Sequence, residues 1–253
     1  MWDAFITLMI NILLFIYDLI GNNFGWAIII FTILVRVVTY PLNARQTKSS
    51  KAMQELQNSK KWQDIQKKYK DDKEKLAQKQ MEVYQEMGIS PFGSCLPLLI
   101  QFPIIIGLYQ AIIRTLAVTP LQLVNLSKHI TDAANLIPIQ SKFWWMELSE
   151  PERLPILGIG IPVLAILVVI TSYIQTKMIT PPGGAAGDGG QGAQMTQAMT
   201  LYMPFLMGYL ALTFASGLAL YFIATNLASI AQYVITGQGN FDNILPKLPK
   251  FNR

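Results

Sequence analysis

The chain has 253 residues, of which 52% are hydrophobic and only 14% are charged, and its mean hydropathy is +0.35. Soluble domains carry about 25% charged residues, so the shortage of charge excludes an ordinary soluble domain. Residues 44–88 hold 11 of the 20 Lys and Arg residues and 7 of the 15 Asp and Glu residues. This distribution predicts an integral membrane protein with one charged insert outside the membrane. The single cysteine, Cys95, excludes an intramolecular disulfide and a cysteine-based metal cluster.

Residues 1–22 are expected to form an amphipathic helix that lies in the outer membrane interface. Asp3, Thr7, Asn11 and Asp18 share one helical face, and apolar side chains occupy the remainder. Glycine and asparagine at residues 21–23 then end the helix. The segment has no basic n-region and no small-residue cleavage site, so it is not expected to be an ordinary signal peptide. A sixth membrane span is the alternative.

Five apolar segments are long enough to span a membrane, which takes about 20 residues. They cover residues 23–43, 89–115, 154–177, 198–214 and 217–237. Because only two residues separate the last two segments, these must form a tight helical hairpin. The predicted fold is therefore all-α. It is a polytopic membrane protein with five transmembrane helices, a cytoplasmic helical hairpin and the N-terminal interfacial helix.

Residues 44–88 have helical periodicity on both sides of a plausible turn at residues 70–72, which predicts an antiparallel helical hairpin. The side chains expected to form its apolar stripe are Met53, Leu56, Trp62, Ile65 and Tyr69 on one arm and Leu76, Met81, Tyr84 and Met87 on the other. A solvated spacer is the alternative. The interleaved aromatic residues favour a packed hairpin or a docking surface.

The remaining loops differ in kind. The extracytoplasmic loop, residues 116–153, contains Phe143, Trp144 and Trp145, which predict an aromatic anchor at the membrane interface. Residues 178–197 are Gly-rich and predict a flexible cytoplasmic loop. Residues 238–253 form a basic cytoplasmic tail, which either determines topology or contacts anionic lipid or ribosomal RNA.

The basic residues predict the orientation. If residues 44–88 are cytoplasmic, the inner segments carry 15 Lys and Arg residues and the outer segments carry 4. Loops rich in Lys and Arg stay on the cytoplasmic side. The N-terminus is therefore expected outside and the C-terminus in the cytoplasm.

Arg36 lies within the first expected span, where an arginine costs on the order of 3 kcal/mol. Either its long side chain extends to the inner interface, or it faces a polar pocket open to the cytoplasm. Other polar side chains favour the pocket, because they collect in the inner halves of several spans: Thr39, Gln101, Thr171, Ser172, Gln175, and Thr225, Ser229 and Gln232 on one helical face with Asn226 beside it. Polar contacts scattered between helices would not need to share one depth.

Methionines recur every four residues through the fourth span, at Met195, Met199, Met203 and Met207. Methionine is flexible and suits surfaces that accept many partners. Met199, Met203 and Met207 are candidates for a surface along which a client segment slides, and ordinary packing is the alternative.

The sequence contains no recognisable catalytic arrangement. No carboxylate lies inside an expected span, and the chain has neither a phosphate-binding loop nor a dinucleotide fingerprint. The only histidine, His129, lies in the outer loop. We expect no enzymatic activity, no metal and no cofactor.

Three motifs resemble the YidC/Oxa/Alb family of membrane protein insertases. They are ILVRVVTYPL at residues 33–42, the stretch from YKDDKEKL to GLYQAI at residues 69–112, and SGLALYFIATNLASIAQYVI at residues 216–235. The resemblance implies a bacterial plasma membrane protein that inserts and folds nascent membrane proteins without hydrolysing nucleotide, alone or with the Sec translocon. It also implies that Arg36 and Gln175 line the family's groove, and that Phe222 stands where relatives often have Trp or Tyr.

The resemblance further implies contacts of the hairpin and tail with the ribosome, the Sec translocon or a targeting receptor. The chain lacks a lipoprotein signal and a large periplasmic domain, and it begins without a transit peptide, which favours a bacterial plasma membrane. Two other functions stay open. One is a small-anion channel or carrier that uses Arg36 as a selectivity charge, and the other is a structural assembly factor without a groove. The sequence leaves the oligomeric state open, and a monomer is compatible with it.

Overall fold

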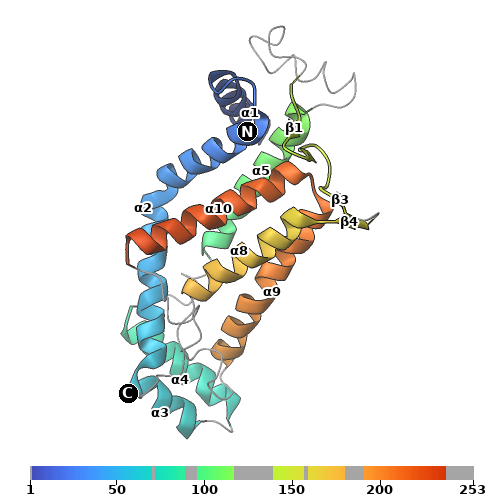
Figure 1. Cartoon of the computed structure of the whole chain (residues 1–253). Helices are drawn as coiled ribbons and strands as arrows, with labels where there is room; N and C mark the ends of the chain where they lie inside the picture. Colours follow the sequence, from blue (N-terminus) through green and yellow to red (C-terminus); the bar gives the residue numbers. More distant parts are fainter. Residues whose placement is uncertain are drawn as a thin grey trace, which may run out of the picture. The chain divides into compact units, whose positions relative to one another are not determined.

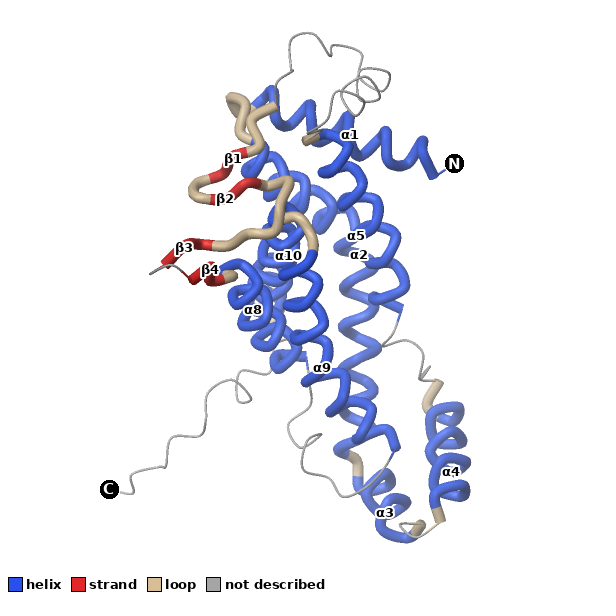
Figure 2. Tube along the Cα trace, turned by 90° about the vertical axis from the view of Figure 1, so that its right-hand side faces the viewer, coloured by secondary structure: helices blue, strands red, loops and turns tan. Residues whose placement is uncertain are grey.

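The computed structural model describes residues 2–69, 72–88, 96–116, 139–156, 159–179 and 191–237, and these are mostly helical. The helices are α1 Trp2–Leu19, α2 Phe24–Asn58, α3 Lys60–Lys68, α4 Lys73–Glu86, α5 Leu96–Thr115, α8 Val163–Ile179, α9 Gln191–Thr213 and α10 Ser216–Ile235 (Figure 1). Four short strands, drawn red in Figure 2, correct the all-α expectation: β1 Lys142–Phe143, β2 Met146–Glu147, β3 Leu154–Ile156 and β4 Ile159–Ile161.

The third expected span begins later than predicted. Residues 154–161 were expected to be helical, but β3 and β4 pair as an antiparallel hairpin in which Leu154 lies opposite Ile161. Pro155 and Gly160 both disfavour a helix, and they face each other across this hairpin. The helix α8 starts only after Pro162. The fourth expected span differs in the other direction, because α9 begins at Gln191 and takes up part of the expected Gly-rich loop.

α2 has no break where the first span was expected to end. The helix begins after Asn23, whose side-chain oxygen accepts a hydrogen bond from the Trp26 backbone nitrogen at 3.2 Å. It then runs for 35 residues through Pro41 to Asn58. The first arm of the charged hairpin therefore consists of the end of α2 together with α3.

Three helical segments in the described residues are long and apolar enough to cross a membrane: Trp2–Leu19, Phe24–Ala44 and Ser216–Ile235. Val163–Ile179 and Leu201–Thr213 are shorter apolar helices. The first segment is the one expected to lie in the interface, so length and composition alone do not separate a span from an interfacial helix. The arrangement of five spans stays a prediction.

The chain divides into two compact units. Unit 1 contains Met1–Val38, Ile100–Thr171 and Leu206–Ala228, and unit 2 contains Thr39–Leu99, Ser172–Phe205 and Ser229–Arg253. The core of unit 1 is apolar and joins side chains of α1, the start of α2, α5, the 143–148 segment, α8, α9 and the start of α10. Glycines allow close approach within it. A Cβ built at Gly107 on α5 would lie 2.6 Å from the ring of Phe5 and 2.9 Å from the sulfur of Met9, both on α1.

The helical hairpin of unit 2 has a small core of its own. Leu56, Trp62, Val83 and Tyr84 are buried together with part of Ile65, and the Trp62 and Tyr84 ring centroids are 5.2 Å apart. α3 ends at Lys68 and α4 begins at Lys73. Residues 70 and 71 of the predicted turn lie outside the described residues. The two helices lie side by side (Figure 2).

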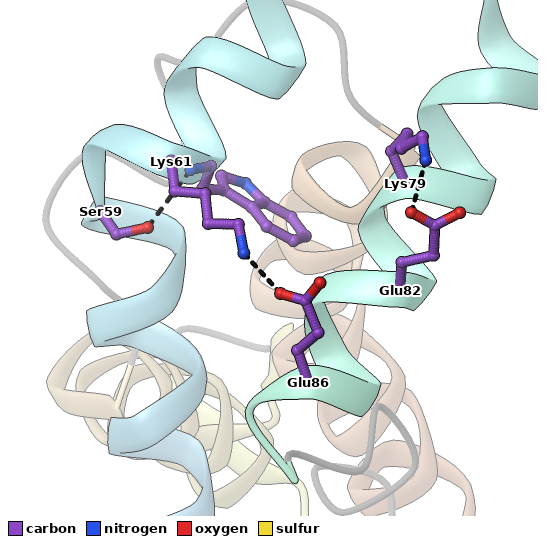
Figure 3. A network of polar contacts seen from close by, with 6 residues as sticks. Ser59, Lys61, Lys79, Glu82 and Glu86 are labelled. Carbon is purple, nitrogen blue, oxygen red and sulfur yellow. Dashed lines mark hydrogen bonds and ion pairs between the residues drawn. The ribbon is translucent and has the colours of Figure 1, made fainter.

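The predicted stripe of the hairpin was wrong in part. Leu76 is buried as expected, but Met81 and Met87 are exposed, and Val83 takes a core position that the prediction omitted. The Met53 side chain lies outside the described residues. A Lys61–Glu86 ion pair of 2.5 Å joins the arms, and Lys79 pairs with Glu82 at 2.6 Å within α4 (Figure 3). His129, the segment 180–190 and the tail 238–253 also lie outside the described residues.

Candidate polar site within the helices

The buried side chains of α10 change from mainly apolar to polar along the helix. Its first two turns, from Ser216 to Phe222, are buried almost entirely in the apolar core of unit 1. Thr225, Asn226 and Ser229 are buried as well, although they are polar. Buried polar side chains require hydrogen-bond partners, so the contacts of this part of α10 identify where the unit holds polar groups.

A polar cluster in unit 1 centres on Tyr221. Its hydroxyl oxygen accepts a hydrogen bond of 2.5 Å from the Gln101 amide on α5. The Thr225 hydroxyl, one turn further along α10, interacts with the same tyrosine hydroxyl. Arg36 on α2 lies close enough to interact electrostatically with that oxygen. Three helices therefore place donor groups around one phenol.

A second contact joins α8 to α10. The Asn226 amide donates a hydrogen bond of 3.0 Å to the hydroxyl of Thr171, and both residues are buried. The Thr171 hydroxyl donates in turn to the Leu167 carbonyl at 2.7 Å within α8. Arg36, Gln101, Tyr221, Thr225 and Asn226 are called the Arg36 cluster below, with Thr171 as its contact on α8.

Tight apolar packing adjoins this cluster one helical turn before Tyr221. A Cβ at Gly217 would lie 3.2 Å from the Ile112 side chain on α5, 3.2 Å from the Ile28 side chain on α2 and 3.2 Å from the Leu148 carbonyl. The Gly217 nitrogen already donates a 3.1 Å hydrogen bond to that carbonyl. We call this contact of α2, α5, α10 and the 148 loop the Gly217 junction. It leaves no room for even one added methyl group without a shift.

The structure places the predicted site residues in both units. In unit 1, Arg36 and Gln101 meet at the Tyr221 hydroxyl, and Thr171 and Asn226 bond to each other. Phe222 is in the same unit, but it is buried in the apolar core with its ring against Tyr221 at 5.9 Å between centroids. The others belong to unit 2: Thr39, Gln175, Ser229 and Gln232. Thr39 accepts a 3.2 Å hydrogen bond from Asn43 on α2, Ser229 is buried, and Gln175 and Gln232 are partly exposed.

The predicted methionine surface is only partly described. Met203 and Met207 are half-buried, and Met207 packs against the core of unit 1. The Met199 side chain lies outside the described residues. The exposed side of α9 is instead aromatic and aliphatic. Tyr202 is 71% exposed, and Phe205 and Tyr209 follow it at helical spacing.

Tyr221 is the residue that the sequence prediction missed. It lies in the apolar run LALYFIA, and the prediction of the polar pocket considered only amide side chains, Ser, Thr and Arg, so it left out the tyrosine hydroxyl. The sequence spacing could have identified Tyr221, because Tyr221 and Thr225 are four residues apart and therefore share a helical face.

The Arg36 cluster contains neutral amide and hydroxyl groups and one fixed cation, and none of its members is a carboxylate. A guanidinium offers five donors and keeps its charge at any accessible pH. The cluster therefore suits acceptor groups such as carboxylates and peptide carbonyls, and it holds no activated nucleophile. Among the described residues, no group of three or more His, Cys, Asp or Glu side chains could hold a metal ion.

Together these features define a helical integral membrane protein with a partly buried polar cluster that contains one cation. The sequence model of the family described as 60Kd inner membrane protein matches residues 15–243, and the chain belongs to that family.

Several similar proteins are named membrane protein insertases. Membrane protein insertase YidC of Oceanobacillus iheyensis is 34% identical over 219 residues, which cover 85% of this chain and 75% of that protein. Membrane protein insertase MisCA of Bacillus subtilis is 34% identical over 242 residues, covering 93% and 79% respectively. The crystal structure of an active YidC insertase with its first transmembrane domain resolved superposes with a TM-score of 0.56 at 25% identity, over 92% of this chain and 46% of that one. The motif resemblance is thereby confirmed.

Proposed function

We propose that the chain is a membrane protein insertase, and that a client's polar N-terminal tail enters a hydrated groove lined by the Arg36 cluster. The difficult step of insertion is moving polar groups through hydrocarbon. A wet space that reaches partway into the bilayer shortens that path. The observation that carries this proposal is the position of the donor-rich cluster one turn from the close-packed Gly217 junction on the same helix.

Arg36 acts in this mechanism as an electrostatic attractor. A guanidinium in a partly desolvated space attracts acidic residues of the client tail more strongly than it would in bulk water. Gln101, Tyr221 and Asn226 hold the surrounding polar surface in place through the hydrogen bonds described above. The client's apolar segment then moves from the groove into lipid, and burial of its apolar surface at about 25 cal/mol per Å² drives the step without nucleotide.

The exposed side of α9 is the surface that we propose for the departing segment. Tyr202, Phe205 and Tyr209 project from this face, whereas Met203 and Met207 are half-buried. The methionines then support the aromatic face from behind, and their flexibility lets it adapt to clients of different shape.

We further propose the topology expected from the charges, with the N-terminus outside and the hairpin and C-terminus in the cytoplasm of a bacterium. The surface of α1 supports an interfacial position, because it has three distinct sectors. One sector is buried in unit 1, including Ile6 and Leu13. A second exposes Asp3, Asn11 and Asp18, and a third exposes Leu8, Phe15 and Leu19. A helix in the membrane interface contacts protein, water and lipid at the same time, and the three sectors of α1 suit these three surroundings.

The cytoplasmic hairpin is the proposed contact for a ribosome, a Sec translocon or a targeting receptor. Met81 and Met87 are exposed beside its charged residues, and they offer apolar contact area outside the small core.

Replacement of Arg36 tests the proposed function. We expect Arg36→Ala, reconstituted in liposomes, to slow insertion of clients with acidic translocated tails by about fivefold, the effect of losing roughly 1 kcal/mol of attraction. Arg36→Lys should retain most of the rate, because the charge remains. Insertion is measured by protease protection of the client tail.

Arg114→Ala is the matched control. Arg114 on α5 is also an arginine of unit 1, but it pairs with Asp3 on α1 at 3.3 Å and lies outside the Arg36 cluster. It should leave insertion of acidic tails unchanged. Normal rates for correctly folded Arg36→Ala would contradict the attractor role, and anion-selective current through the purified protein would favour the channel instead.

A further inference from the structure

Four aromatic rings of unit 1 form a continuous ladder that the insertion mechanism does not use. Trp26 on α2 meets Phe143 on β1 edge to face, with 6.1 Å between ring centroids. Phe143 stacks on Trp144 at 5.1 Å, and Trp144 stacks on Trp145 at 5.6 Å. These four residues are called the aromatic ladder. It links the start of a helix that can cross a membrane to the turn between β1 and β2.

Phe143 is the buried ring of the ladder, and the three tryptophans are exposed or half exposed. Phe143 is buried against α2, where a Cβ at Gly25 would lie 2.2 Å from its ring. Trp144 is 74% exposed, and Trp26 and Trp145 are about half exposed. Trp144 also has a φ of 54°, a conformation that is rare and strained for a bulky residue. The Trp144 ring is thus exposed although its backbone has a conformation that is unfavourable for a bulky residue.

A buried carboxylate ties the Trp145 end of the ladder to α8. Glu152 is only 8% exposed, and its two oxygens have separate partners. One accepts the Trp145 indole N–H at 3.0 Å, and the other accepts the backbone N–H of Leu164 in the first turn of α8 at 3.1 Å. A carboxylate at a helix N-terminus is favourably placed. The ladder is therefore braced on α2 through Gly25 and on α8 through Glu152.

We propose that the aromatic ladder is a binding surface for lipid headgroups, which fixes the depth of unit 1 in the bilayer. Indole rings prefer the membrane–water interface, because they combine an apolar body with a polar N–H. Trp26 is the third residue of α2, at the end of the candidate span Phe24–Ala44, so its exposed side faces the surroundings of that span. Lys142 directly precedes Phe143, and Arg153 follows Glu152; both cations are exposed. On the proposed topology this is the outer interface.

Fluorescence quenching by spin-labelled lipids tests the proposal in the absence of any client, so its result is independent of insertion activity. The protein keeps Trp144 alone, with the other four tryptophans changed to Phe, in phosphatidylcholine–phosphatidylglycerol vesicles. We expect a headgroup nitroxide to quench Trp144 at least about twofold more than a nitroxide at carbon 12 of the acyl chain. A protein that keeps only Trp62, which is buried in the hairpin, is the control and should respond to neither.

The other outcomes overturn the proposal. Stronger quenching by the deep nitroxide would place the ring in hydrocarbon. Quenching by aqueous acrylamide alone would place it in water, and protection from all three quenchers would mean that a protein surface, such as a second copy of the chain, covers it. If the single-tryptophan protein does not fold, the five individual Trp→Phe variants give the same assignment by difference.

Discussion

Gly25 matters because the ring of Phe143 occupies the space where a side chain would be. A Cβ at this position would lie between 2.2 and 2.8 Å from three ring atoms of Phe143. We expect Gly25→Ala to destabilise the protein by about 1–3 kcal/mol through overpacking. Thermal unfolding in detergent micelles measures the change.

The Phe143→Ala background provides the control for this prediction. Without the ring, the added methyl group has space, so Gly25→Ala should then cost little. An equal loss of stability in both backgrounds would show that the glycine acts through the backbone rather than through the aromatic ring.

At the residue scale the sequence located much of the polar cluster but not its centre. Thr171 and Asn226 were expected at one depth on separate helices, and they form a direct hydrogen bond. Tyr221 was not predicted as a polar residue of the site, because an aromatic ring within a hydrophobic run is typical of apolar packing. Phe222 was placed with the groove from the family motif, and the structure puts it in the core. Periodicity assigns a helical face, but it does not say which neighbouring helix that face meets.

The hairpin elements α3 and α4 depend partly on charge. The hydrogen bond and the charge of Lys61 lower the pKa of Glu86, and the bond to Lys75 lowers the pKa of Asp72, which caps α4. A carboxyl group whose folded-state pKa is lowered contributes stability above its unfolded pKa, and it loses that contribution as the pH falls through the folded value. The hairpin should therefore loosen below about pH 4.5, the ordinary value for glutamate.

Acrylamide quenching of Trp62 in the full-length single-tryptophan protein measures this loosening. Access to Trp62 should rise as the medium is acidified below that pH. Glu86→Gln should already show part of the increase at neutral pH and a smaller further rise on acidification. Identical acid profiles for the two proteins would exclude a role for the Lys61–Glu86 pair.

At the element scale, the predicted start of the third span was wrong in a region where short apolar runs contain Gly and Pro. Residues 154–162 contain two prolines and two glycines among isoleucines and leucines, a run that suits a buried helix or a strand equally well by composition. The β3–β4 hairpin resolves that ambiguity. In the long charged segment, helices were expected from periodicity, and the described residues there form the end of α2, α3 and α4. Ser59 and Asp72 both cap helices there.

For the whole molecule, the proposed water-filled groove predicts which positions react with an aqueous reagent. In a Cys95→Ser background, Gln175→Cys should be labelled by a membrane-impermeant thiol reagent added from the cytoplasmic side. Val38→Cys is the matched control. Its side chain is 77% exposed on α2, but lipid should cover that face and protect it. Labelling of Val38→Cys with protection of Gln175→Cys would contradict the groove, and so would equal labelling of both.

A protein that admits hydrated chains into a bilayer works in a membrane that also stores voltage, about 2.3 kcal/mol per elementary charge for each 100 mV. A continuous file of water across such a membrane would let ions discharge it. The Gly217 junction brings three helices and a loop carbonyl within contact distance beside the polar cluster. If the proposed groove is hydrated, packed side chains at the Gly217 junction would keep ions from crossing on this side of the cluster.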